Sequence, residues 1–136
     1  MSRLGEIRHA TAEALRQIDT GVSVKTWPAP QVDPPVIVIG DGDPWVTRSG
    51  GEFDGYSIRG VRMRVLLGVA RHTEEAGFRK LDRWVESIDA VLRQAAMPEG
   101  CVPPVIEEIG PRGTVSYAEV SLFGCFVDLL VVDQLC

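Results

Sequence analysis

The sequence lacks the features that mark nucleic-acid-binding, membrane and disulfide-stabilised proteins. Its 136 residues include 14 Lys and Arg against 19 Asp and Glu, a formal net charge of -5, whereas a protein that grips phosphate backbones needs a basic surface. No apolar run reaches the roughly 18–20 residues of a membrane helix, and the polar first residues lack the apolar centre of a secretory signal. The three cysteines, Cys101, Cys125 and Cys136, form no CxxC pair. We therefore expect a reduced, cytoplasmic protein in which Cys125, inside an apolar run, is a buried and inert thiol.

Short catalytic motifs are also missing. The chain has no GxSxG elbow, no GxxxxGK[ST] phosphate loop and no HExxH helix. Its two histidines, His9 and His72, have no Cys, His or Glu at the spacing of a metal-ligand set. We therefore expect a protein that is not an enzyme and that holds no cofactor and no metal.

Hydrophobic periodicity predicts two helices. Apolar residues recur at steps of three and four over residues 3–19, where Ser2 can cap the start and Gly21 can end the helix. The clearest helix covers residues 74–96, with Thr73 as its expected cap and Trp84 on the flank of its apolar stripe.

Alternating or β-branched segments predict the strands, which we place at 22–26, 36–39, 56–70, 102–109 and 114–132. The order of helices and strands predicts a single α+β domain over residues 1–136. Its core is an antiparallel or mixed sheet of about four to five strands, with both helices packed on one face.

The last strand is apolar on both of its faces. One face carries Tyr117, Phe123, Cys125, Val127, Leu129 and Val131, and the other Ala118, Val120, Leu122, Phe126, Leu130 and Val132. Two helices can cover only one face of a sheet, so the second face needs another cover. A neighbouring subunit would supply it, which predicts an oligomer. Two alternatives stay open: the long segment folds onto itself, or the proline-rich segment 27–35 covers it.

Residues 40–55, GDGDPWVTRSGGEFDG, form an acidic, glycine-rich stretch that we interpret as a loop. Its acids are spaced almost as in a calcium loop, but Trp45 stands at a ligand position and Val46 where the sharp turn needs glycine. Asp41 and Asp43 could also hold a metal and a diphosphate, yet no phosphate loop accompanies them. We therefore expect a docking loop rather than a reaction centre, in which exposed Trp45 is an anchor.

Arg62 and Arg64 point the same way from the strand at 56–70. They either lie on a solvated face, pairing with Glu119 or Asp128, or contact another subunit or partner.

The order of the segments resembles the tail-terminator proteins of long-tailed bacteriophages and the related tail-completion, or head-tail joining, proteins. The segments that carry the resemblance are "PPVIVIG", the acidic stretch, "RGVRMRVLLGVA", "GFRKLDRWVESIDAVLRQA" and "VPPVIEEIG", followed by the long apolar strand. The match is one of apolar spacing over nearly the whole chain.

The resemblance implies a structural virion protein with no catalytic residues. Such subunits form a hexameric ring that caps the tail tube, stops its polymerisation and meets the head's connector or neck protein. DNA passes through the lumen without specific binding, and assembly takes place in the host bacterial cytoplasm before the ring reaches the tail-head junction of the virion. As contact positions we expect Asp41, Asp43, Trp45, Asp54, Arg62 and Arg64. The alternatives are a head-tail neck or stopper protein, and a small cytoplasmic enzyme that uses the Asp41/Asp43 loop.

Overall fold

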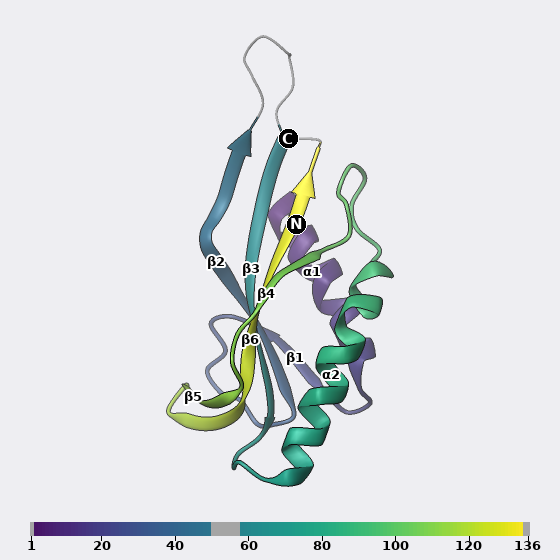
Figure 1. Ribbon diagram of the computed structural model, residues 1–136. Coiled ribbons are helices and arrows are strands. Elements are labelled where there is room, and N and C mark those ends of the chain that lie inside the picture. The colour runs from purple at the N-terminus through teal and green to yellow at the C-terminus, as the bar shows by residue number, and fades with distance from the viewer. Residues whose placement is uncertain (1, 50–57, 135–136) are drawn as a thin grey trace.

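The protein is described by a computed structural model over residues 2–49 and 58–134 (Figure 1). In these residues two α-helices and six strands follow one another along the chain. Their bounds are α1 Arg3–Leu15, β1 Ser23–Thr26, β2 Val36–Ser49, β3 Ile58–Ala70, α2 Glu75–Arg93, β4 Val105–Ile109, β5 Gly113–Tyr117 and β6 Val120–Asp133, with a 3-10 turn, Arg16–Ile18, after α1.

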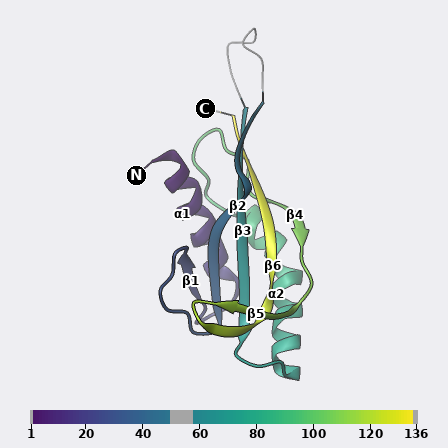
Figure 2. The same cartoon turned by 90° about the vertical axis from the view of Figure 1, so that its left-hand side faces the viewer.

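The strands form one mixed sheet. Its order is β1-β2-β3-β6-β4, and β5 pairs with β6 off this path. β1 lies parallel to β2, and every other pair is antiparallel. Figure 2 shows β1 and β4 at opposite edges of the sheet. The α+β prediction is confirmed, and the described residues contain six strands where the sequence predicted about four to five.

Both helices pack on the same face of the sheet. Apolar side chains of α1, such as Ile7, and of α2, such as Ile88, share one buried core with the sheet residues Met63, Val65 and Leu129. Trp84, which we expected on the flank of α2, is fully buried in this core. Its indole N–H donates to the Asp19 carboxylate at 3.1 Å. This hydrogen bond offsets the free-energy cost of burying the polar N–H group. In the described part of the chain, neither helix has the length and apolar character needed to cross a bilayer.

The helix caps are predicted correctly in one case and wrongly in the other. Ser2 caps α1, since its hydroxyl oxygen accepts a hydrogen bond from the Gly5 backbone N–H at 3.0 Å. At the start of α2 the cap position is Glu74 rather than Thr73, and no side chain bonds to the free N–H groups there. Acidic Glu75 in the first turn still suits the positive end of the helix dipole.

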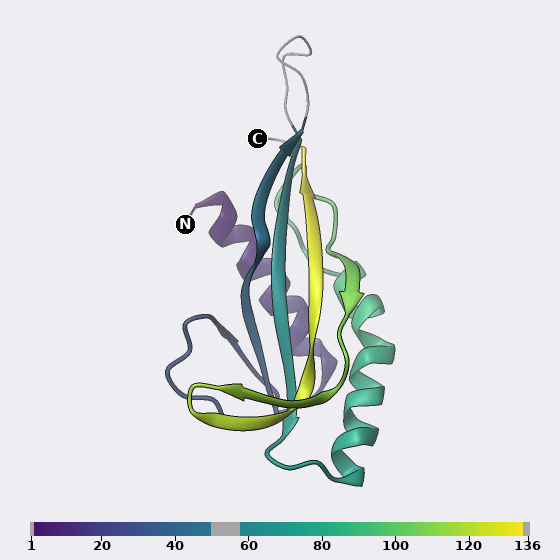
Figure 3. The ribbon, with the colours of Figure 1, turned by 60° about the vertical axis from the view of Figure 1, so that its left-hand side comes forward.

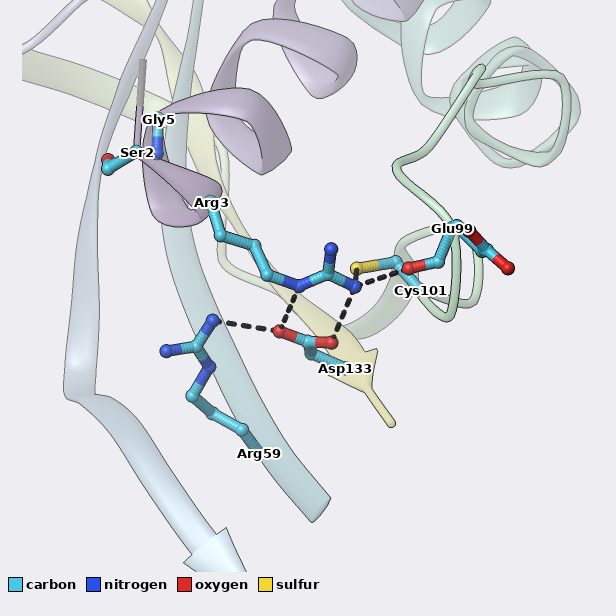
Figure 4. Close-up of polar contacts among 7 residues, drawn as sticks. All are labelled: Ser2, Arg3, Gly5, Arg59, Glu99, Cys101 and Asp133. Atoms are coloured by element: carbon cyan, nitrogen blue, oxygen red, sulfur yellow. Dashed lines mark hydrogen bonds and ion pairs between the residues drawn. The ribbon is translucent and has the colours of Figure 1, made fainter. Parts of the chain in front are cut away.

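A buried carboxylate fastens α1 to the sheet (Figure 4). Asp133, at the end of β6, is fully buried. It accepts two hydrogen bonds from the Arg3 guanidinium, both at 2.9 Å, and one from Arg59 at 2.8 Å. Arg3 also donates to the Glu99 carbonyl and, at 3.5 Å, to the Cys101 sulfur. The hydrogen bond with Asp133 raises the pKa of Arg3 above its ordinary value, which keeps this cation charged.

Two of the cysteines are poorly suited to react. Cys125 is buried in the core, as predicted, and burial raises the pKa of its thiol. The pKa of Cys101 is also raised, first by burial and then by the charge of Asp133. Because the thiolate is the reactive form, a raised pKa lowers reactivity at neutral pH.

The prediction of one strand over 114–132 is wrong. Residues Gly113–Tyr117 and Val120–Asp133 are instead two strands of a hairpin. The turn consists of Ala118 and Glu119, both of which have positive φ angles, 49° and 65°. No glycine, asparagine or proline marks this turn, although these residues usually occupy such backbone conformations.

We call the face of the sheet away from the helices the open face (Figure 3). Its lower half, next to β5, is covered by the chain itself, because the proline-rich segment 27–35 supplies Ala29 and Val32 to a second small core. The other members of that core are Val36, Val38, Leu66 and Leu122. Both alternatives therefore hold for this half: the segment 27–35 packs over it, and the predicted long strand folds back on itself as β5, whose Val115 and Tyr117 pack against the same core. Above it, Phe126, Leu130 and Val132 are only half-buried.

Candidate docking surface

Residues 40–49, the first part of the stretch interpreted as an acidic loop, belong to the long strand β2, and residues 50–55 lie outside the described residues. β2 and β3 stay paired as far as Ser49 and Ile58, and β6 pairs with β3 as far as Arg59, so three strands run to this end of the sheet (Figure 1). The pairing slips once: Asp41 lies opposite Met63 and Val46 opposite Val61, so residues 42–45 face Arg62 alone. This bulge contains Pro44, which has no backbone N–H to donate to a ladder. The strand can continue past Pro44 because the bulge places this residue where the ladder of hydrogen bonds is already interrupted.

The bulge brings Gly42 against the backbone of β3. A Cβ atom at Gly42 would lie 2.6 Å from the Arg62 Cβ and 3.0 Å from its carbonyl carbon. Glycine is needed here because of this close approach and not because of an unusual φ angle.

Replacing Gly42 with alanine should therefore deform the bulge and displace Arg62. We expect the free energy of unfolding to fall by about 1–3 kcal/mol, the usual cost of overpacking. Chemical denaturation measures the loss. Gly40→Ala is the matched control, since its nearest neighbour would be the Arg64 carbonyl oxygen at 3.5 Å, an ordinary contact. Equal stability of the two variants would contradict this account of the bulge.

The bulge, β3, β6 and β4 together surround an acidic hollow of about 320 Å³ on the open face. Its charged lining consists of Asp41, Asp43, Glu107, Glu108, Asp128, Arg62 and Arg64. The structure thus gathers four of the six predicted contact residues in one place. Trp45 lies in the same bulge but does not line the hollow. Asp54 lies outside the described residues.

The two arginines of the hollow have partners within the chain. Arg64 lies 3.9 Å from Asp128, the partner proposed for it, and covers the Phe126 ring at 4.5 Å from its centroid. Arg62 pairs instead with Glu107 at 3.1 Å and donates to the Thr47 hydroxyl at 3.2 Å. These pairs are partly exposed, so each contributes only about 0.2–1 kcal/mol.

Acids outnumber arginines in the hollow. Asp41 borders it, but its carboxylate reaches the helix side of the sheet, where it forms an ion pair with Arg8 of α1 at 3.4 Å. Among the residues that the structure describes, Asp43 and Glu108 belong to no ion pair. The acidic hollow therefore keeps a negative potential and favours contact with a cationic group.

An apolar groove of about 360 Å³ adjoins the hollow. Its apolar lining is Trp27, Val38, Leu66, Tyr117 and Phe126, and it shares Asp41 and Arg64 with the hollow. Trp27 remains exposed at its rim although it touches the chain's own surface. The Tyr117 hydroxyl accepts a hydrogen bond from the Ala29 backbone N–H at 3.2 Å, which ties the groove wall to the segment 27–35.

The contributions of β4 to the hollow and of the aromatic residues to the groove were not predicted from the sequence. Glu107 and Glu108 both line the hollow because the pairing of β4 with β6 slips between Ile106 and Glu108. The sequence signal for the contribution of β4 is its pair of adjacent acids in a five-residue strand. The aromatic lining of the groove could not be found, because it joins segments separated by about ninety residues in sequence.

The described residues contain no group of three or more His, Cys, Asp or Glu side chains arranged to hold a metal ion. His9 and His72 are exposed and lie outside both the hollow and the groove. What the arrangement offers is a contact surface, with apolar and negatively charged parts side by side.

Comparison with known proteins adds no family: no protein-family model matches the chain, and no curated protein matches it significantly.

Proposed function

We propose that the chain is a structural protein of a long-tailed phage virion, which forms a ring on the end of the tail tube. The ring stops tube polymerisation and joins the tail to the head connector. The observation that carries this proposal is the upper part of the open face. There Phe126, Leu130 and Val132 are only half-buried beside the acidic hollow, and the Arg64 guanidinium lies over the Phe126 ring. Such a surface is typical of a subunit that works in an assembly.

The proposed mechanism depends on two unlike surfaces in each copy. One end of the ring is complementary to the last ring of tail tube protein and the other end is not, so no further tube ring can add. That second end is free to meet the head connector or neck protein.

Charge supports a role beside passing DNA. The net charge of -5 and the surplus of carboxylates in the acidic hollow repel phosphate groups. DNA would therefore pass through the lumen of the ring without being held. The proposal assigns no catalytic residue, cofactor or metal to the chain.

Removing the gene from the phage is the direct test. We expect electron microscopy to show tails of runaway length without heads, because nothing caps the tube. A neck or stopper protein would instead leave tails of normal length that fail to join heads, and this outcome would favour that alternative. Normal virions would overturn both assignments.

Replacing Asp41 and Asp43 together with alanine separates a docking surface from an enzyme site. We expect several-fold fewer virions in which head and tail are joined, because the docking surface loses two charges but keeps its shape. The purified variant should remain folded. Asp89→Ala, on the exposed side of α2, is the control and should assemble normally. Complete loss of function in a variant that still folds and still forms rings would instead favour a reaction at these carboxylates.

A further inference from the structure

The large apolar side chains that remain exposed are not scattered over the surface. In the described part of the chain they are Trp27, Trp45, Val102, Val105 and Ile109, between 39% and 59% exposed. Trp27 directly follows β1, and Trp45 lies on β2 beyond the reach of β1. The other three lie on β4 or just before it. All five therefore mark the two opposite edges of the sheet (Figure 2).

Both edges present unpaired strands. β1 pairs only with Val36–Ile39, so the rest of β2 has no strand beside it on that side among the described residues. At the other edge, β4 pairs only with β6 within the same residues. An unpaired edge with exposed apolar side chains is a template for pairing with another chain.

The two edges carry opposite charges along their strands. Lys25 is the charged residue of β1, and Arg48 that of the paired segment 46–49 of β2. β4 contains Glu107 and Glu108 and no cation. Asp41 and Asp43, in the bulge region between the two cations, depart from this pattern, but Asp41 is neutralised by Arg8. Opposite charges facing each other across a strand pair stabilise it.

The faces also match. Lys25 lies opposite Val38, which belongs to the open-face core, and Glu108 lies opposite Asp128, which lines the hollow on the same face. Residues directly opposite each other in a ladder point to one face. Lys25 of one copy and Glu108 of the next would thus lie on the same open face of a continued sheet.

Strand direction decides the geometry. β4 runs against β6, β6 against β3, and β3 against β2, while β1 follows β2. β4 is therefore antiparallel to both strands of the opposite edge. A second copy rotated about an axis along the strands keeps these directions, so β4 meets an antiparallel neighbour, the more stable pairing.

We infer that a second copy of this chain docks edge to edge, with β4 of one copy paired antiparallel to the β1–β2 edge of the next. The contact is head-to-tail, uses a different edge at each end, and closes into a ring when the rotation closes. The inference rests on the proposed ring and names its interface. It places Lys25, Glu108 and Val105 at the contact and continues the sheet from copy to copy with all helices on one side.

Charge reversal tests this interface in the full chain. Lys25→Glu and Glu108→Lys each bring like charges together, and we expect each to raise the concentration at which half of the rings dissociate by at least about tenfold at low salt. The double reversal restores opposite charges and should return that concentration to near the wild-type value. Sedimentation velocity over a concentration series measures it. Ala90→Asp, an exposed change on α2, controls for added negative charge.

A third variant tests the apolar part of the contact. Val105→Asp should weaken the ring at least as strongly as Glu108→Lys, while Val105→Thr keeps the branched shape and should be milder. Circular dichroism checks that each variant is folded.

The outcomes separate the interface from the function. Wild-type rings that tolerate both single reversals and Val105→Asp as well as they tolerate Ala90→Asp would overturn the edge pairing and leave the ring in place. A double reversal that fails to recover would overturn it too. A wild-type chain that stays monomeric at the highest concentration would overturn the ring and this interface together.

Discussion

Replacing Gly124 with alanine is expected to destabilise the fold strongly. Gly124 lies opposite Gly68 on β3 and Gly113 on β5, where β6 passes between two partner strands. A Cβ atom there would lie 1.8 Å from the Leu67 carbonyl oxygen and 2.8 Å from its carbon. The obstacle is backbone, so no side-chain rotation can relieve it.

The expected loss exceeds the usual cost of overpacking, about 1–3 kcal/mol. Because a small domain is stable by only about 5–15 kcal/mol, such a loss removes a large share of its stability. Urea denaturation followed by circular dichroism would show a much lower midpoint for Gly124→Ala than for the wild type.

Gly113→Ala is the matched control for this change. Gly113 is the partner of Gly124 in the β5–β6 ladder, yet a Cβ atom there would have no heavy atom within 4 Å. We expect its midpoint to stay close to that of the wild type. Equal midpoints for the two variants would mean that β6 and β3 can separate without cost at this position.

Replacing Asp133 with asparagine is expected to have the second largest effect. The substitution keeps the shape of the side chain but removes the negative charge that Arg3 and Arg59 share. Removing one partner of a buried ion pair typically costs about 3–5 kcal/mol, because the remaining charge loses its compensation in a low-dielectric site. The Arg59 side chain, only 13% exposed, suffers most from this loss.

Asp128→Asn provides the comparison. Asp128 also faces an arginine from β6, but at 3.9 Å and with 40% of its side chain exposed, so we expect a loss of no more than about 1 kcal/mol. Thermal melts of both variants at neutral pH measure the difference. If Asp133→Asn melted no lower than Asp128→Asn, the buried carboxylate would not be what fastens α1.

The sequence predicts the helices and the class of the fold well, because their signals are local. The apolar stripe of α2 and the Ser2 cap of α1 each depend on residues a few positions apart. Runs such as Val36–Ile39 also predict that a strand exists. They do not predict how far it extends, because glycine and proline in residues 40–44 predict a loop where the pairing slips once and then resumes.

The candidate site was only half predictable for the same reason. Asp41, Asp43, Arg62 and Arg64 could be selected as charged residues near a strand, but nothing local placed them around one hollow. Their meeting depends on the register of β2 on β3, which the bulge sets. The hairpin turn at residues 118–119 was missed because positive φ angles there are imposed by strand pairing rather than by residue type.

The clamp at Asp133 joins residues 130 positions apart, Arg3 and Asp133. During synthesis α1 emerges early, whereas the carboxylate that fixes its first turn emerges only with the last strand. Contacts between such distant residues form late and slow a folding reaction. The first turn of α1 therefore lacks this clamp until β6 has been synthesised and has paired with the rest of the sheet.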